Sequence, residues 1–158
     1  MASSPLSFYI HVPYCVKRCG YCDFNTYTPA ELTNNSNGDL NSVSEGYIDQ
    51  LIAESKLALR EVSGPIETIF IGGGTPTLIA PKEIIRLLNS LEADFGFAKD
   101  IEITIEANPD SVTLEKLMEL RHGGINRISF GMQSSVSHVL KVLDRTHNPA
   151  NVAAAVNA

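Results

Sequence analysis

Four short apolar segments, separated by stretches with helical periodicity, constrain the fold more than any other feature of this sequence. The segments lie at residues 6–12, 66–71, 101–107 and 125–132. They are rich in β-branched and aromatic residues and are typical of buried strands. Strands that alternate with helices form parallel βαβ units with right-handed connections. We therefore expect an α/β fold with a parallel sheet, either doubly wound or part of a barrel.

The stretches between these strands carry the signals of helix starts and ends. Pro81 suits a first helical turn, Gly96 is a typical C-terminal stop, and Thr113 is a candidate N-cap. Residues 28–44 are instead rich in Asn, Ser and Gly, which predicts an exposed loop. Helices are expected at residues 45–62, 81–95, 114–121 and 135–143, and from residue 149 onward.

Each expected strand is followed by a motif that can carry chemistry. The four motifs, in chain order, are a cysteine-rich loop, GGGTPT, EANPD and GMQSS. In parallel α/β folds, ligands and catalytic groups gather at the carboxyl ends of the strands. We therefore expect the chemistry of this protein at that edge of the sheet.

All three cysteines of the chain, Cys15, Cys19 and Cys22, lie within eight residues after the first strand. An odd number cannot pair fully into disulfides, and clustered thiols in a reducing compartment more often bind metal. Structural zinc takes four ligands, and His11, inside the expected strand, is the candidate for the fourth. A cubane iron–sulfur cluster usually takes four thiolates, so three leave one iron open. The spacing favours the open cluster, with zinc and unligated thiols as the alternatives.

Three further motifs offer backbone or polar groups to a ligand. The glycines at 72–74 let a ligand approach the backbone, or they only form a tight turn. Glu106 ends a strand and Gln133 follows one. Glu106 either accepts bonds from ribose hydroxyls or faces solvent, and Gln133 is either a ribose contact or a satisfied turn residue. Arg145 follows a helix, whose macrodipole already favours a cation there.

Composition excludes several classes of protein. The 158 residues are 44% hydrophobic and 19% charged, which is typical of one soluble domain. A net charge of −6 argues against a nucleic-acid partner. We expect no transmembrane segment and no signal peptide, and therefore a cytoplasmic protein. His138 and His147 are expected at its surface.

Jointly, these motifs resemble the radical S-adenosylmethionine (SAM) superfamily. The resemblance is carried by C-x3-C-x2-C after the first strand, the glycine motif after the second and Glu106 at the end of the third. The segments YIHVPYC, GGGTPT, EANP, RISFGMQS and LDRTH resemble one branch more closely. That branch contains the oxygen-independent coproporphyrinogen III oxidases and the related haem chaperones. The resemblance covers about residues 6–148.

The resemblance implies two cofactors and an electron donor. Cys15, Cys19 and Cys22 would hold a [4Fe-4S] cluster, whose fourth iron is chelated by the amino and carboxylate groups of S-adenosyl-L-methionine. Reductive cleavage of SAM would give methionine and a 5′-deoxyadenosyl radical. The residues that match cofactor-binding positions of the family are Tyr9, Tyr21, Gly73, Gly74, Thr75, Glu106, Gln133 and Arg145.

Phe24 separates the two kinds of relative within the branch. The oxidases resemble C-x3-C-x2-C-x-C, and this chain has Phe24 in place of the last cysteine. That departure resembles the haem chaperones and implies haem or porphyrin as a ligand and haem-accepting proteins as partners. Phe24 itself either fills core or contacts the macrocycle. Oxidative decarboxylation of coproporphyrinogen III in porphyrin biosynthesis is the alternative function, and a non-enzymatic zinc-binding module is the second.

The family fold is a partial TIM-like (β/α)6 barrel, of which this chain supplies four βα units. We therefore expect residues 1–158 to be the N-terminal part of a radical SAM domain, with an incomplete barrel and without a C-terminal domain. The last strand would then expose Ile128, Phe130 and Met132 at an unpaired edge. Exposed edges invite association, so the isolated chain is expected to be prone to aggregation.

Overall fold

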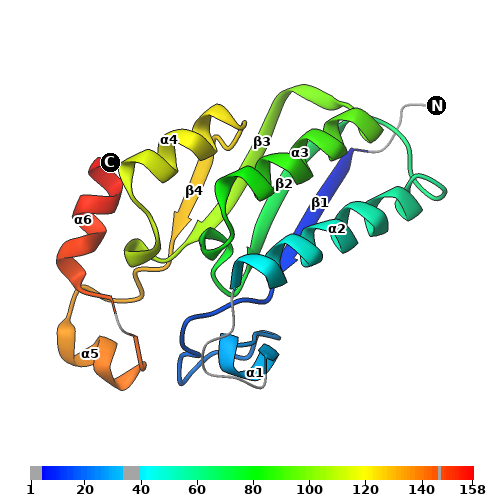
Figure 1. Ribbon diagram of the computed structural model, residues 1–158. Helices are drawn as coiled ribbons and strands as arrows, with labels where there is room; N and C mark the ends of the chain where they lie inside the picture. The colour runs from blue at the N-terminus through cyan, green and yellow to red at the C-terminus, as the bar shows by residue number, and fades with distance from the viewer. Residues whose placement is uncertain (1–4, 34–39, 146) are drawn as a thin grey trace.

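The computed structural model of the chain describes residues 5–33, 40–145 and 147–158 (Figure 1). Its centre is a parallel sheet with the strand order β1-β2-β3-β4. This order follows the chain, as in a barrel segment, whereas a doubly wound sheet reverses its order at a switch point. The strands are β1 (Leu6–Val12), β2 (Ile66–Gly73), β3 (Phe97–Ala107) and β4 (Arg127–Phe130).

Helices α2, α3 and α4 lie over one face of the sheet (Figure 1). The expected end signals are confirmed: Pro81 occupies the first turn of α3, Gly96 ends it with φ of 72°, and the Thr113 side chain caps α4 by accepting from the Lys116 amide. Among the described residues, no helix combines the length and apolarity needed to cross a membrane. The helices are α1 (Pro29–Thr33), α2 (Leu40–Ala58), α3 (Pro81–Phe95), α4 (Leu114–His122), α5 (Ser137–Val142) and α6 (Pro149–Asn157), with short 3-10 turns η1 (Pro76–Leu78) and η2 (Pro109–Ser111).

The prediction of an exposed loop over residues 28–44 is wrong at both ends of that segment. Helix α1 occupies its beginning, and α2 starts at Leu40, while residues 34–39 lie outside the described part of the chain. Helix α1 begins with one half of a capping box, because the Thr28 amide donates to Glu31 Oε2 at 2.7 Å. The Thr28 hydroxyl donates to the same oxygen at 2.9 Å. The Asn- and Ser-rich composition of the segment concealed this short signature.

The strands are buried mainly on one face, so the expectation of buried strands is half right; Thr104, on the other face of β3, is buried as well. Across the sheet, Ile10 pairs with Ile71, Ile71 with Ile105, and Ile105 with Ile128, which places a row of isoleucines in one layer. The first three of these are buried in a core that also contains α3. The alternate positions point the other way, and Tyr9 is 58% exposed there. Within the described residues, the helices cover only one side.

The two strands nearest the C-terminus differ from their expected lengths. Strand β3 begins at Phe97, four residues before the expected start, because Phe97 already pairs with Ile66 of β2. Strand β4 is shorter than expected and, in the part of the chain described here, pairs with β3 alone. Association through its outer edge stays a prediction.

Candidate cofactor site

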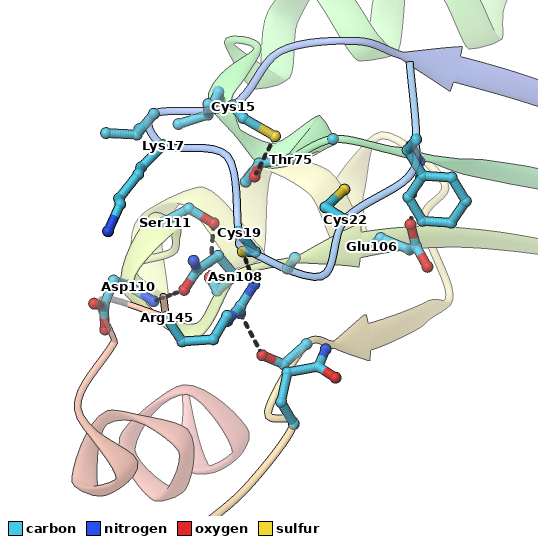
Figure 2. Close-up of a pocket in the computed structure, with 18 of the residues that line it drawn as sticks. Cys15, Lys17, Cys19, Cys22, Thr75, Glu106, Asn108, Asp110, Ser111 and Arg145 are labelled. Carbon is cyan, nitrogen blue, oxygen red and sulfur yellow. Dashed lines mark hydrogen bonds between the residues drawn. The ribbon is translucent and has the colours of Figure 1, made fainter. Parts of the chain in front are cut away.

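All four loops at the carboxyl ends of the strands line one cavity of about 530 Å³. The cavity lies at the edge of the sheet where the strand-end rule predicts chemistry. Figure 2 shows the cysteine loop on one side of this space, with Thr75, Glu106, Asn108 and Arg145 around it. Segments far apart in the sequence therefore meet at a single site.

The cysteine loop is held in shape by its own backbone. The Cys15 amide donates to the Tyr27 carbonyl at 3.0 Å, and the Tyr27 amide donates to the Pro13 carbonyl at 2.7 Å. Arg18 closes the loop from outside, because its Nη2 donates to the Thr26 carbonyl at 2.5 Å and to Glu31 at 3.0 Å. The loop is thus anchored at both of its ends before any ligand is considered.

The three thiols are free and all line the cavity. Cys15 is buried, while Cys19 and Cys22 are half-buried. Burial raises the pKa of the Cys15 thiol, and the hydroxyls of Thr75 and Thr26 act in the opposite direction. Thr75 Oγ1 lies 4.0 Å from the Cys15 sulfur, which is a long hydrogen bond of the kind that stabilises a thiolate.

The arrangement suits a cluster better than one metal ion. In the described ranges, no three His, Cys, Asp or Glu side chains converge closely enough to hold a single ion. His11, the candidate fourth ligand for zinc, is engaged elsewhere: its Nδ1 lies 3.0 Å from the Tyr9 hydroxyl and its Nε2 lies 2.9 Å from the Asn25 carbonyl. The sulfurs border a space rather than a point, so they fit a larger inorganic group.

The glycine motif packs against the cysteine loop. The Gly74 amide donates to the Val12 carbonyl, and the Thr75 amide donates to the Tyr14 carbonyl, both at 2.7 Å. A Cβ on Gly74 would collide with the Tyr14 carbonyl oxygen and would lie 2.9 Å from the Cys15 sulfur. Gly73 has φ of 113°, a left-handed conformation that other residues rarely adopt. These glycines therefore allow a close approach of two backbones, which sequence reasoning did not consider.

Glu106 lines the cavity at the end of β3 and is half-buried. Its Oε2 accepts from the Gly73 amide at 3.2 Å, so the carboxylate also fixes the glycine motif. Burial first, and then the Glu106 charge, raise the pKa of Tyr9. Tyr9 itself does not belong to the cavity lining, unlike Tyr21 and Gln133, which both do.

Arg145 joins the last loop to the cysteine loop. Its Nη1 donates to the Cys19 sulfur at 3.6 Å, and its Nη2 donates to the Gly131 carbonyl at 2.5 Å (Figure 2). His147, expected at the surface, is only 3% exposed. That expectation is wrong because the ring folds back against the Arg145 side chain, whose Nε lies 3.3 Å from its Nδ1. His138 is exposed, as expected.

Phe24 stands at the cavity and is 61% exposed. The expectation that it fills core is therefore wrong in this structure.

Several residues of the cavity escaped sequence reasoning. Asn108 accepts from the Asp110 amide at 3.1 Å, and the Ser111 hydroxyl donates to the Asn108 carbonyl at 2.7 Å. The Asn-Pro pair after the third strand was a usable signal for this turn. Lys17 and Asp144 form an ion pair at 3.2 Å at the cavity, and no local signal predicts a partner so distant in the sequence.

Comparison with known proteins identifies the family. The Radical SAM superfamily model matches residues 9–158. The chain is 42% identical over 156 residues to heme chaperone HemW of Mycobacterium tuberculosis (strain ATCC 25618 / H37Rv), covering 98% of this chain and 38% of that protein. It is 38% identical over 147 residues to heme chaperone HemW of Escherichia coli (strain K12), covering 92% of this chain and 36% of that protein.

The fold has a solved counterpart in coproporphyrinogen III oxidase (HemN) from Escherichia coli. The TM-score is 0.84 at 31% identity, and the match covers 98% of this chain and 34% of that chain. The chain thus spans less than two fifths of the length of these relatives. The expected resemblance to the branch of haem chaperones and coproporphyrinogen oxidases is confirmed, as is the α/β fold of a partial TIM-like barrel. The chain belongs to the radical SAM superfamily.

Proposed function

We propose that this chain is the cofactor-binding part of a radical SAM protein of the haem chaperone type. It binds a [4Fe-4S] cluster and SAM, and the complete protein handles haem for transfer to acceptor proteins. The observation that carries the proposal is the shared cavity, in which the three free thiols face the glycine motif and Glu106. The similarity to two heme chaperones supports the choice of haem.

Each cavity residue has a role that its chemistry permits. Cys15, Cys19 and Cys22 hold the cluster as thiolates, and the Thr75 hydroxyl supports the Cys15 sulfur. When bound, the cluster and SAM supply one-electron cleavage of the sulfonium and a 5′-deoxyadenosyl radical. The protein positions the cofactor and limits the access of water to it.

The remaining cavity residues bind SAM. The backbone at Gly73 and Gly74 receives its methionyl part, and Glu106 accepts bonds from the ribose hydroxyls. Tyr21, Gln133 and Arg145 line the same cavity. Tyr21 would lie near the adenine, Arg145 would offer a cation, and Gln133 would offer a polar side chain. Tyr9, on β1, is proposed as a SAM-binding residue from its match to a family position, and it does not line this cavity.

Phe24 favours a haem chaperone over an oxidase, because it replaces the fourth cysteine of the oxidase motif. Its exposed ring at the cavity offers a flat apolar surface to a macrocycle, and aromatic stacking contributes about 0.5–1.5 kcal/mol beyond the burial of area. Decarboxylation of coproporphyrinogen III stays the second candidate, because the coproporphyrinogen III oxidase from Escherichia coli shares this fold at a TM-score of 0.84.

The described chain supplies the first four βα units of the barrel, since its strands follow one another in order. An electron donor is needed for cluster reduction, and three free thiols require a reducing compartment, for which the cytoplasm is the prediction. Haem-accepting proteins are the expected partners of the complete protein.

Anaerobic reconstitution with iron and sulfide tests the cluster. We expect about four irons and four sulfides per chain and a broad visible absorbance, both lost in Cys15→Ala, Cys19→Ala and Cys22→Ala. Asp23→Ala, at an exposed position of the same loop, is the matched control and should retain the cluster. Stoichiometric zinc in a protein that refuses iron and sulfide would establish the zinc-binding module instead.

A haem titration and an anaerobic assay separate the two porphyrin functions. The complete protein is expected to bind haem with a shift of the Soret absorbance and to leave coproporphyrinogen III unchanged in the presence of reductant and SAM. Products are resolved by chromatography. Protoporphyrinogen IX at catalytic turnover would establish the oxidase and overturn the chaperone proposal.

A further inference from the structure

The guanidinium of Arg145 is held from three directions. Its Nη1 reaches the Cys19 sulfur at 3.6 Å, its Nη2 reaches the Gly131 carbonyl at 2.5 Å, and its Nε reaches His147 Nδ1 at 3.3 Å. The first two partners line the cavity, while His147 lies behind the side chain and does not. The Nε contact is therefore the one that supports Arg145 from outside the site.

His147 is poorly explained as a residue that only fills space. Its side chain is 3% exposed, and its Nε2 makes no hydrogen bond of good geometry in the described chain, where the Met132 backbone is its nearest polar neighbour. A buried polar group without a partner is costly, so an apolar side chain of similar volume would serve a core better. The other ring nitrogen, Nδ1, does make a contact, because it faces Arg145.

The surroundings keep the ring neutral. Burial lowers the pKa of His147, and the adjacent Arg145 cation lowers it further, while the charge of Asp110 and the backbone of Met132 act in the opposite direction. Only a neutral imidazole with its proton on Nε2 presents a lone pair at Nδ1. Since Arg145 Nε carries a hydrogen, Nδ1 must be the acceptor of this bond.

We propose that His147 is a positioning residue for the cofactor site. By accepting from Arg145 Nε, it orients the guanidinium so that one amino group faces Cys19 and the other is fixed on the Gly131 carbonyl. The five donors of Arg lie in one rigid plane, so a bond at Nε sets the direction of both amino groups. As far as it concerns SAM, this inference rests on the proposed function, in which Arg145 belongs to the binding site.

Nitrogen NMR of the chain without cofactors tests the hydrogen bond directly. We expect His147 to show an unprotonated Nδ1 and a protonated Nε2 at neutral pH, and the Arg145 Nε–H to exchange slowly with water. Exposed His138 serves as the control, with both tautomers populated. The slow exchange should vanish in His147→Leu and persist in His147→Asn, whose amide oxygen replaces Nδ1 as an acceptor. A proton on Nδ1, or slow exchange that survives His147→Leu, would overturn the proposal.

SAM binding to the reconstituted protein tests the consequence. His147→Leu should weaken binding about tenfold, the equivalent of one hydrogen bond, while His147→Asn should stay within about threefold of the parent. In an Arg145→Met background, His147→Leu should cause no further loss, because the two residues act through one contact. Equal weakening by Leu and Asn, or additive losses in the double variant, would reduce His147 to a structural role.

The melting temperature of each variant shows whether it is folded before binding is compared. If the parent protein itself fails to take up a cluster or SAM, the proposed function fails, and the NMR measurement still decides whether His147 orients Arg145. The two proposals are thus separable, because the tautomer and the exchange rate are measured without either cofactor.

Discussion

The two faces of the sheet use neighbouring residues of the same strand for different purposes. Ile105 is fully buried and belongs to the core beneath the helices, whereas Glu106, the next residue, lines the cavity and accepts from the Gly73 amide. Side chains alternate between faces along a strand, so one strand can supply both apolar packing and polar groups. Stability and chemistry can therefore be altered separately in this molecule.

The largest effect on stability is expected from the covered face. Ile105→Ala removes a fully buried side chain from the core and should lower the free energy of unfolding by about 2–5 kcal/mol, measured by urea denaturation. Lys99→Ala, at an exposed position of the same strand, should change it by less than about 0.5 kcal/mol. If the two variants lost similar amounts of unfolding free energy, the proposed difference between the two faces of the sheet would be wrong.

A smaller but still substantial effect is expected where the glycine motif meets the cysteine loop. Gly74→Ala places a Cβ against the Tyr14 carbonyl and the Cys15 sulfur, which should cost about 1–3 kcal/mol and reduce the iron content after reconstitution. Gly46→Ala is the matched control, because a Cβ there meets nothing within 4 Å and the residue lies inside α2. In this control the free energy of unfolding should rise by about 0.5–1 kcal/mol, because Ala is more stable than Gly inside a helix. Unchanged iron uptake by Gly74→Ala would show that the close approach is dispensable.

On the face of the sheet that carries Glu106, a substitution is expected to change SAM binding more than the stability of the fold. Glu106→Gln keeps an oxygen that accepts from the Gly73 amide, so we expect a stability change below about 1 kcal/mol. Loss of the charge should weaken SAM binding about tenfold, measured by calorimetry. It should also lower the pKa of Tyr9, which Glu106 helps to raise. Glu102→Gln, exposed on the same side of β3, should leave SAM binding unaltered.

The smallest effect on stability is expected from a change of pH, which acts through the protonation of His147. Its pKa in the folded protein lies below the ordinary value of 6.5, so the unfolded chain binds the proton more readily. The contribution of His147 to stability is therefore fully present above pH 6.5 and is lost as the pH falls below it. Thermal melting between pH 5 and 8 should show this loss, and His147→Asn should reduce it. An identical pH profile in that variant would exclude His147 as the titrating group.

The sequence alone determined the local features of this protein. The spacing of its apolar residues predicts the strands and most helices, because an element that buries one face needs apolar residues at the period of a helix or a strand. The three cysteines lie within eight residues, so their proximity needed no tertiary contact. The pairing of Thr28 with Glu31 was equally local, although the Asn- and Ser-rich composition around it concealed the signal.

Which distant residues meet depends on the tertiary fold. Strand order was open between a barrel and a doubly wound sheet, because strands of the same composition can pair in either order. The burial of His147 depends on the fold around Arg145, and the ion pair of Lys17 with Asp144 joins opposite ends of the chain. The close approach at Gly74 likewise requires two loops brought together by the pairing of β1 with β2. Such contacts follow from the path of the backbone through space, which a local pattern of residues does not encode.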